Sequence, residues 1–343
     1  MRTAGFGVDR VCNIGFVLIL TLLAVGCATP ERLAKRILTA PNLQQRSVAQ
    51  WGEQWIQAMS GGTNRFETLT VSVGPPDAKL NVAELPPGAY NLEFTSSIET
   101  KANGARQFLL QCSPKTNCPA TTVEERGTVV ILHGYSVQKE TMIPWAFVLA
   151  QAGFRAVLVD LRGHGRSTGQ NFSCGKVETS DLVQLLDHLI DKGVCKGPVG
   201  VLGLSFGADL ALQWAARDPR VHAVVAIAPY NRPEEAFVRF AKEMGFPVSV
   251  KTLESALGVV ALKLDLNWSD WSGEAAVRRI PQPVFLIGGE KDPISPPRDL
   301  DEIKRAAAEG TEMLLVPEAN HFIIGFSFQQ IAEPVKAWFQ ARL

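Results

Sequence analysis

The sequence lacks the motifs that mark several large groups of proteins. It has no paired Cys-x-x-Cys motifs, no His-Glu-x-x-His motif and no Gly-x-x-x-x-Gly-Lys loop, so neither a metal site nor a nucleotide site is predicted. It has no basic patch, and 34 basic residues balance 34 acidic ones, so a nucleic-acid partner is not expected. Internal repeats and low-complexity segments are also absent. Nothing in the remaining sequence calls for a cofactor.

What is present is the composition of an ordinary globular protein. Hydrophobic residues make up 46% of the 343 positions. This length allows one large domain or two ordinary ones and gives ample material for a buried core.

The N-terminus has the pattern of an export signal. Arg2 and Arg10 flank a short polar start, and residues 11–26 are mostly apolar. A stretch of about 16 residues is short for a membrane span, which needs roughly 20. A secretory signal is therefore the better interpretation.

The end of this stretch resembles the bacterial lipobox. Leu23–Cys27 reads Leu-Ala-Val-Gly-Cys, with Ala24 where leucine is usual. The resemblance implies that residues 1–26 are removed and that Cys27 carries the lipid anchor to the membrane. Ala28 follows the cysteine in place of aspartate, which implies the outer membrane of the cell envelope, facing the periplasm. An ordinary cleaved signal and an uncleaved anchor remain alternatives.

The remaining cysteines suit an oxidising compartment, where disulfides persist. Cys112 and Cys118 bracket a turn-rich loop and are predicted to form a local bridge. Cys174 and Cys195 flank a predicted helix of about 15 residues, roughly 22 Å long. Because a disulfide needs Cα atoms within about 7 Å, that pair is expected only if the intervening loop folds back. Free buried thiols are the alternative for all four.

Residues 27–90 are predicted to form an N-terminal extension. A helical packing or tether element is expected within residues 28–62, followed by a strand-like segment at Thr68–Val73 that is either part of a linker or an edge hairpin. The apolar face of the predicted helix comprises Val48, Trp51, Trp55 and Met59.

From residue 91 to residue 343 strands and helices alternate. Residues 91–100 and 105–111 read as two strands joined by a turn at Asn103-Gly104. Six apolar runs follow, at residues 127–132, 154–160, 199–204, 221–227, 283–287 and 312–316. Uninterrupted apolar strands separated by helices predict an α/β fold whose sheet is mostly parallel and covered by helices on both faces.

Gly203–Gly207 reads Gly-Leu-Ser-Phe-Gly, directly after one of these strands and directly before a predicted helix. A serine in a Gly-x-Ser-x-Gly motif is reactive where a strand turns sharply into a helix and lifts its hydroxyl above the sheet. Side chains at the two glycine positions would collide in so tight a turn. Ser205 is therefore predicted to be a nucleophile.

Four motifs together resemble the α/β-hydrolase fold, which implies an eight-stranded sheet. They are His133-Gly134, Asp160–Ser167, Gly203–Gly207 and Gly289–Pro293 followed by Asn320-His321, each at the end of a predicted strand and in the order of that family.

The resemblance implies a Ser-His-Asp triad. A serine hydroxyl needs a base, and His321 lies in a loop after the last strand. Asp292, directly after a strand, would orient the imidazole. Glu290, Glu234 and Glu235 are rival acids. The other histidines are given structural roles: His133, His164, His188 and His222.

The backbone N–H groups of Phe206 and Tyr135 are predicted to form the oxyanion hole. The Tyr135 ring either lines an acyl pocket or simply packs, and both interpretations stay open.

Residues 229–280 interrupt the alternation of strands and helices. An apolar helical stripe and a continuous apolar run favour a helical lid over an apolar pocket, and packing on the body is the alternative. The residues concerned are Ala236, Phe237, Phe240, Ala241, Met244, Ala256–Leu262, Trp268 and Trp271.

These features predict a serine hydrolase that cleaves small-molecule carboxylic esters through an acyl-enzyme. A peptidase or amidase would use the same residues, and a non-catalytic binding protein would keep the fold without the chemistry.

Overall fold

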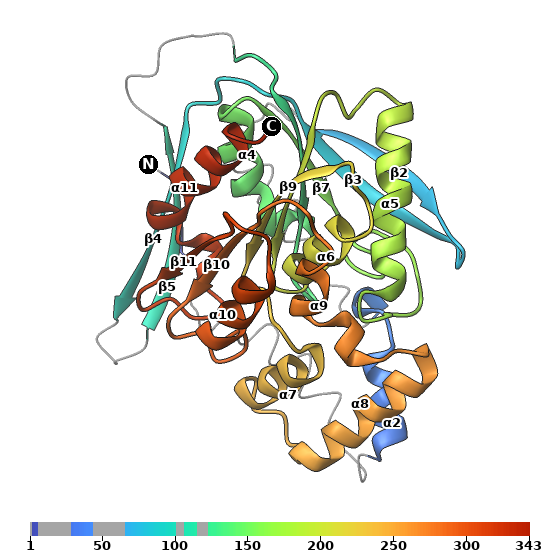
Figure 1. Cartoon of the computed structure of the whole chain (residues 1–343). Coiled ribbons are helices and arrows are strands. Elements are labelled where there is room, and N and C mark those ends of the chain that lie inside the picture. Colours follow the sequence, from blue (N-terminus) through green and yellow to red (C-terminus); the bar gives the residue numbers. More distant parts are fainter. Residues whose placement is uncertain (1, 6–28, 44–65, 101–105, 115–122) are drawn as a thin grey trace.

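A sheet of eight strands forms the centre of the protein in a computed structural model that describes residues 2–5, 29–43, 66–100, 106–114 and 123–343 (Figure 1). The strand order is β11-β10-β9-β8-β6-β7-β3-β2. The strands are β2 (Glu67–Val73), β3 (Ala78–Leu85), β6 (Gly127–Leu132), β7 (Phe154–Val159), β8 (Val199–Leu204), β9 (Val221–Ile227), β10 (Phe285–Gly289) and β11 (Glu312–Val316). All neighbours from β7 to β11 are parallel, which confirms the predicted sheet.

Helices cover both faces of this sheet, as its apolar strands require. Every residue of β6 is buried. One face packs against α5 (Lys176–Asp191), α6 (Phe206–Ala215) and α10 (Pro297–Ala306), and the other against α4 (Ile143–Gln151) and α11 (Phe328–Gln340).

The sheet begins before residue 91, where the sequence analysis placed the start of the domain. β2 and β3 form an antiparallel hairpin, and β3 pairs with β7, so this segment is part of the main sheet. The predicted hairpin that follows is also present, as β4 (Leu92–Thr100) and β5 (Arg106–Pro114), but it lies in a separate sheet with β1 (Arg2–Gly5). β4 carries Thr95, Ser96 and Ser97, so its composition differs from that of the buried runs.

A short N-terminal segment packs against the insertion that follows β9. It contains α2 (Pro30–Ile37) and the 3-10 turn η1 (Pro41–Leu43). Leu33 and Ile37 of α2 contact the apolar side of α8. The predicted stripe Val48, Trp51, Trp55 and Met59 lies outside the described residues.

The insertion between β9 and β10 is helical, as predicted. It comprises α7 (Pro233–Glu243), α8 (Val250–Leu264), the 3-10 turn η3 (Trp268–Trp271) and α9 (Gly273–Val277). Pro233 begins α7, and the Ser249 hydroxyl caps α8 by accepting from the Thr252 N–H at 3.1 Å. α7, α8 and α2 project together from one end of the sheet (Figure 1).

Candidate active site

Ser205 lies in a strained turn between β8 and α6. Its φ angle is +53°, which is unusual for a residue with a side chain. The turn needs both flanking glycines, because a Cβ on Gly203 would lie 2.0 Å from the Gly207 carbonyl oxygen and one on Gly207 would lie 2.4 Å from the Leu132 carbonyl oxygen. The predicted strand–turn–helix arrangement is therefore present.

The structure brings together Ser205, His321 and Asp292. The Ser205 Oγ lies 2.8 Å from His321 Nε2, and His321 Nδ1 lies 2.8 Å from Asp292 Oδ2. His321 follows β11 and Asp292 follows β10, so parallel strands deliver all three groups to one edge of the sheet. Because a carboxylate only accepts, the geometry fits the tautomer in which Nδ1–H donates to Asp292 and Nε2 accepts from the serine hydroxyl.

The second carboxylate oxygen of Asp292 is also hydrogen-bonded. Asp292 Oδ1 accepts from the N–H groups of Ile294 at 2.8 Å and Ser295 at 2.7 Å. Its side chain is fully buried, and that of His321 is 8% exposed. The carboxylate is thus fixed in one orientation toward the imidazole.

The three rival acids do not occupy this position. Glu290 is exposed, next to β10. Glu234 and Glu235 lie on α7, where Glu235 pairs with Arg239 and Arg298. Asp292 is therefore the acid that contacts His321.

The two residues predicted to supply the oxyanion donors belong to segments next to Ser205. Phe206 is the first residue of α6, and the first N–H groups of a helix have no partner within it. A Cβ on Gly134 would lie 3.6 Å from the Ser205 Cβ, so the loop after β6 passes next to the serine. Tyr135, the next residue, belongs to this loop.

A buried salt bridge holds that loop against the next strand. Lys139, which begins the 3-10 turn η2 (Lys139–Met142), places its Nζ 2.8 Å from Asp160 Oδ2, and its backbone N–H donates to Asp160 Oδ1. Asp160 also accepts from the Arg166 N–H at 3.0 Å. Burial lowers the pKa of Lys139, but Asp160 and Glu140 outweigh it and leave the pKa raised.

His133 and His164 are structural, as predicted. The His133 Nε2 accepts from the Leu161 N–H at 3.1 Å, so its Nδ1–H donates to the Gly134 carbonyl at 2.8 Å. The His164 Nδ1 lies 2.9 Å from the Arg162 carbonyl. Burial lowers the pKa of both imidazoles, that of His164 to about 3, so both are neutral. The two other histidines lie at a distance from Ser205, His188 on α5 and His222 on β9.

The Tyr135 ring packs in an aromatic cluster between the turn at Ser205 and helix α7. It contacts Phe172 and Phe206 on the body and Phe237 and Phe240 of α7, with ring centroids 5.0 to 6.5 Å apart. The ring therefore packs between the body and α7, and an acyl pocket beside it stays a prediction.

One buried carboxyl group lies in α6 without the contacts that hold Asp292. Asp209 is 1% exposed, and its Oδ1 has no hydrogen-bond partner among the described residues. Burial raises the pKa of Asp209 well above its usual value.

The cysteines of the described residues are free thiols. Cys174 and Cys195 are buried beyond opposite ends of α5. Cys112 is half-buried on β5, which continues past it to Pro114, and burial raises the pKa of its thiol to about 11. The predicted bridge from Cys112 to Cys118 is not formed at Cys112, and Cys118 lies outside the described residues.

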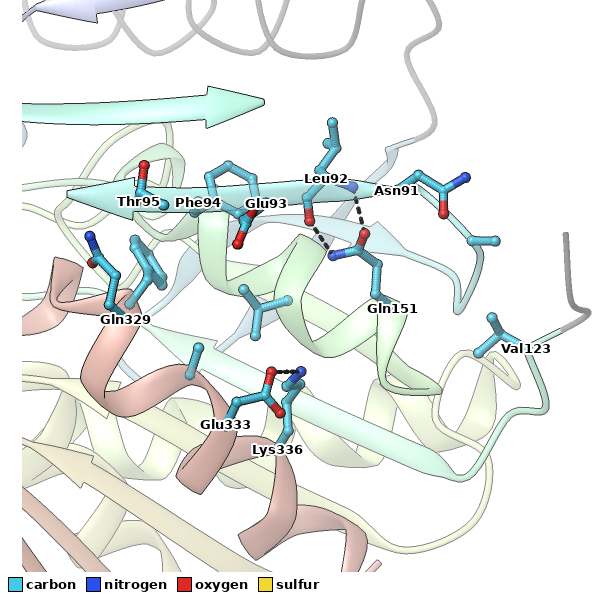
Figure 2. A pocket seen from close by; sticks show the side chains of 14 residues that line it. Asn91, Leu92, Glu93, Phe94, Thr95, Val123, Gln151, Gln329, Glu333 and Lys336 are labelled. Atoms are coloured by element: carbon cyan, nitrogen blue, oxygen red, sulfur yellow. Dashed lines mark hydrogen bonds and ion pairs between the residues drawn. The ribbon is translucent and has the colours of Figure 1, made fainter. Parts of the chain in front are cut away.

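A separate pocket of about 450 Å³ lies between β4, α4 and α11 (Figure 2). Gln151 from α4 pairs with both backbone groups of Leu92 on β4, and Gln329 accepts from the Ser96 N–H and donates to its carbonyl. None of the predicted site residues lines this pocket.

Comparison with known proteins agrees with this architecture. A family model described as serine aminopeptidase, S33, matches residues 123–271. The solved structure of an esterase from Pyrococcus furiosus has a TM-score of 0.57 at 20% identity and covers 81% of this chain and 92% of its own. A putative lipase from Acinetobacter baumannii has a TM-score of 0.57 at 13% identity, covering 84% and 96%. At these identities the likeness concerns the fold, and the chain has the α/β-hydrolase fold.

A curated relative adds similarity in sequence. The uncharacterised protein YqkD from Bacillus subtilis is 26% identical over 207 residues, which are 59% of this chain. The match spans 66% of YqkD, just under two thirds of its length.

Proposed function

We propose that this protein is a serine hydrolase that cleaves carboxylic esters through an acyl-enzyme on Ser205. The observation that carries the proposal is the chain of two 2.8 Å contacts from Ser205 through His321 to Asp292, at a strained turn beside the N-terminus of α6. This arrangement fits nucleophilic attack on a carbonyl carbon.

The reaction would proceed in two steps, acylation of Ser205 and hydrolysis of the acyl-enzyme. The Ser205 oxygen attacks the ester carbonyl while His321 Nε2 takes its proton, and Asp292 stabilises the imidazolium. The negative oxygen of the tetrahedral intermediate is bound by the N–H groups of Phe206 and Tyr135. The leaving alcohol takes the proton from His321. Water then attacks the acyl-enzyme by the same route and releases the acid.

Two considerations favour esters. The aromatic cluster around Tyr135 offers apolar surface for an acyl or aryl group next to Ser205. Two of the solved structures that share the fold are described as an esterase and a putative lipase.

A peptidase or amidase is the second candidate, because the matching family model is that of a serine aminopeptidase. A series of p-nitrophenyl esters of increasing chain length, set against aminoacyl p-nitroanilides, separates the two. Faster turnover of the anilides than of every ester would identify a peptidase or amidase and refute ester hydrolysis as the main activity.

The test of the catalytic role is Ser205→Ala. Loss of the nucleophile should lower kcat on a p-nitrophenyl ester by roughly 10⁴-fold or more, because members of such a triad act as one unit. Circular dichroism and the melting temperature control for folding. A variant that folds and retains the activity would refute the assignment and leave a non-catalytic binding protein.

We also propose that the chain is exported and anchored at Cys27 in the outer membrane, facing the periplasm. The support is the sequence of residues 2–28. Among the described residues, no helix is both long and apolar enough to span a bilayer. Removal of residues 1–26 would take away β1 and leave β5 at the edge of the small sheet.

The anchor is tested by feeding expressing bacteria an alkyne-tagged fatty acid. The wild-type protein should carry the tag and sediment with outer membranes, whereas Cys27→Ser should carry none. Equal labelling of the two proteins would contradict the proposal.

A further inference from the structure

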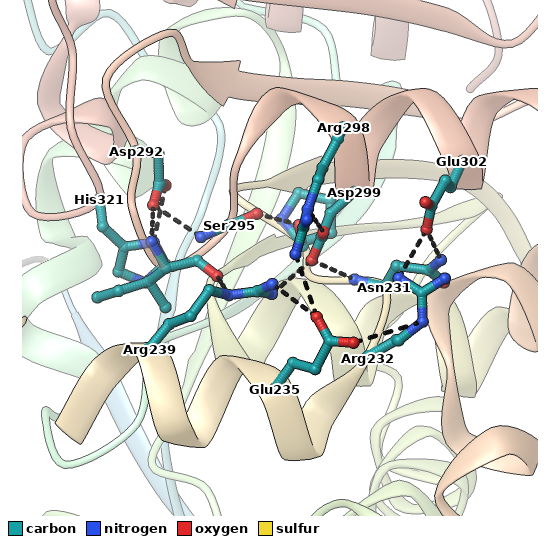
Figure 3. Close-up of polar contacts among 12 residues, drawn as sticks. Asn231, Arg232, Glu235, Arg239, Asp292, Ser295, Arg298, Asp299, Glu302 and His321 are labelled. Carbon is teal, nitrogen blue, oxygen red and sulfur yellow. Dashed lines mark hydrogen bonds and ion pairs between the residues drawn. The ribbon is translucent and has the colours of Figure 1, made fainter. Parts of the chain in front are cut away.

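Arg239 ties the lid helix α7 to the loop that carries Asp292. The Arg239 Nε–H donates to the Ile294 carbonyl at 2.8 Å, and Nη2 lies 2.6 Å from Asp299 Oδ2 at the start of α10. The Arg239 side chain is 17% exposed and that of Asp299 is fully buried. Figure 3 shows Arg239 reaching from α7 toward this loop, where Asp292 contacts His321.

The Ile294 carbonyl belongs to a peptide group that also binds Asp292. The other end of that group is the Ser295 N–H, which donates to Asp292 Oδ1 at 2.7 Å. Arg239 and Asp292 therefore bind opposite ends of one peptide group. A cation on the carbonyl oxygen polarises the group and strengthens its N–H as a donor, as in other chains of hydrogen bonds.

We propose that Arg239 is a positioning residue that holds Asp292 in place through the peptide group between Ile294 and Ser295, and so couples the lid to the triad. This inference rests on the proposed function, because it gives Asp292 its role in the reaction. Arg239 contacts neither Ser205 nor His321. Its consequence is that Asp292 is fully fixed only while α7 lies against the body.

The alternative is that Arg239 serves only its ion pairs. It contacts Asp299 and also Glu235, at 3.1 Å. Replacing Arg239 alone would leave Asp299 buried without its main partner, a change that can unfold a protein. The experiment therefore removes the ion pair first and the bond to Ile294 second.

The test compares three variants. Asp299→Asn removes the ion pair and keeps the Arg239 bond to Ile294. Arg239→Met combined with Asp299→Asn removes that bond as well, without leaving a buried charge. Arg298→Gln is the matched control, because Arg298 contacts Glu235 and Asp299 but not Ile294 and is 64% exposed.

The double variant should show a kcat for ester hydrolysis roughly 10- to 100-fold below that of Asp299→Asn, with KM unchanged, because the reacting groups are misplaced while ground-state binding is kept. Asp299→Asn and Arg298→Gln should stay near wild type. The low-field proton resonance of the His321 Nδ1–H, which reports its bond to Asp292, should broaden in the double variant alone.

Three results would overturn the inference. In the first, the double variant has the same kcat as Asp299→Asn. In the second, the KM of the double variant rises while its kcat does not fall. In the third, Asp299→Asn loses as much kcat as the double variant does. A wild-type protein without Ser205-dependent turnover would refute the proposed function instead. The proton resonance would then still test whether Arg239 fixes the contact between Asp292 and His321.

Discussion

The edge of the sheet that carries Ser205 and helix α8 of the insertion after β9 are fixed in place by different kinds of contact. At the edge, buried polar groups are bonded to the backbone, as Asp292 is by two N–H groups and Asp160 by those of Lys139 and Arg166. Helix α8 packs through apolar side chains against α2 and α7, whereas α7 itself is bonded to the body through Arg239. Directed bonds fix a geometry within tenths of an ångström, whereas apolar packing fixes mainly proximity. The proposed catalytic residues Ser205, His321 and Asp292 lie in the first region.

The largest expected effect concerns the acid at this edge. Asp292→Asn should lower kcat on a p-nitrophenyl ester by about 10⁴-fold, because an amide can hold the wrong tautomer of His321. The melting temperature should change little. Glu290→Gln, the exposed rival acid, is the matched control and should behave as wild type. Equal losses in both variants would contradict the assignment of the acid.

The next effect concerns stability at the same edge. Lys139→Met leaves Asp160 buried without its cation and should lower the free energy of unfolding by roughly 3–5 kcal/mol. Lys291→Met is the control, since Lys291 is 61% exposed and such surface changes stay within about 0.5 kcal/mol. Urea denaturation measures both. A loss in Lys139→Met as small as that of the control would show that the buried salt bridge does not hold the loop.

Two leucines of α8 test the apolar contacts of the insertion. Leu257 is buried in the cluster that α2 joins, and Leu257→Ala should cost about 2–3 kcal/mol, the low end for such changes, because an insertion can collapse around the gap. Leu262 is 84% exposed, and Leu262→Ala should cost less than about 0.5 kcal/mol. Similar losses in the two variants would argue against α8 packing on α2 in solution.

The smallest effect concerns Asp209, which lacks the bonds of Asp292. A raised pKa in the folded state means that the contribution of Asp209 to stability is complete below its unfolded pKa and is lost as the pH rises through its folded pKa. The melting temperature of the wild type should therefore fall by a few degrees more than that of Asp209→Asn between mildly acidic and mildly alkaline pH. Parallel curves would contradict the raised pKa.

The positions of the site residues were predictable because each follows a strand. Ser205 comes directly after β8, and Asp292 and His321 lie in the loops that follow β10 and β11. Parallel strands deliver their carboxyl ends to one edge of the sheet. The sequence left Glu290 as a rival to Asp292, and the contact of Asp292 with His321 distinguishes the two. The geometry agrees with these expectations, and the catalytic roles are tested by the variants above.

Other contacts join residues too distant in the sequence to leave a local signal. Arg239 and Ile294 are 55 positions apart, and the predicted apolar stripe of α7 gives no reason to single out its arginine. Lys139 pairs with Asp160 across 21 positions. For the segment of β2 and β3 the sequence predicts only a linker or an edge hairpin, because no local pattern indicates that β3 pairs with β7.

Whether His321 activates the Ser205 hydroxyl can be measured by intact-mass analysis of the protein after treatment with a fluorophosphonate, followed by peptide mapping. A hydroxyl activated by an imidazole should give a single adduct, located on the peptide that contains Ser205, and His321→Ala should abolish it. Ester turnover by a protein that the fluorophosphonate does not label, or an adduct on another residue, would contradict the role of Ser205 as the nucleophile.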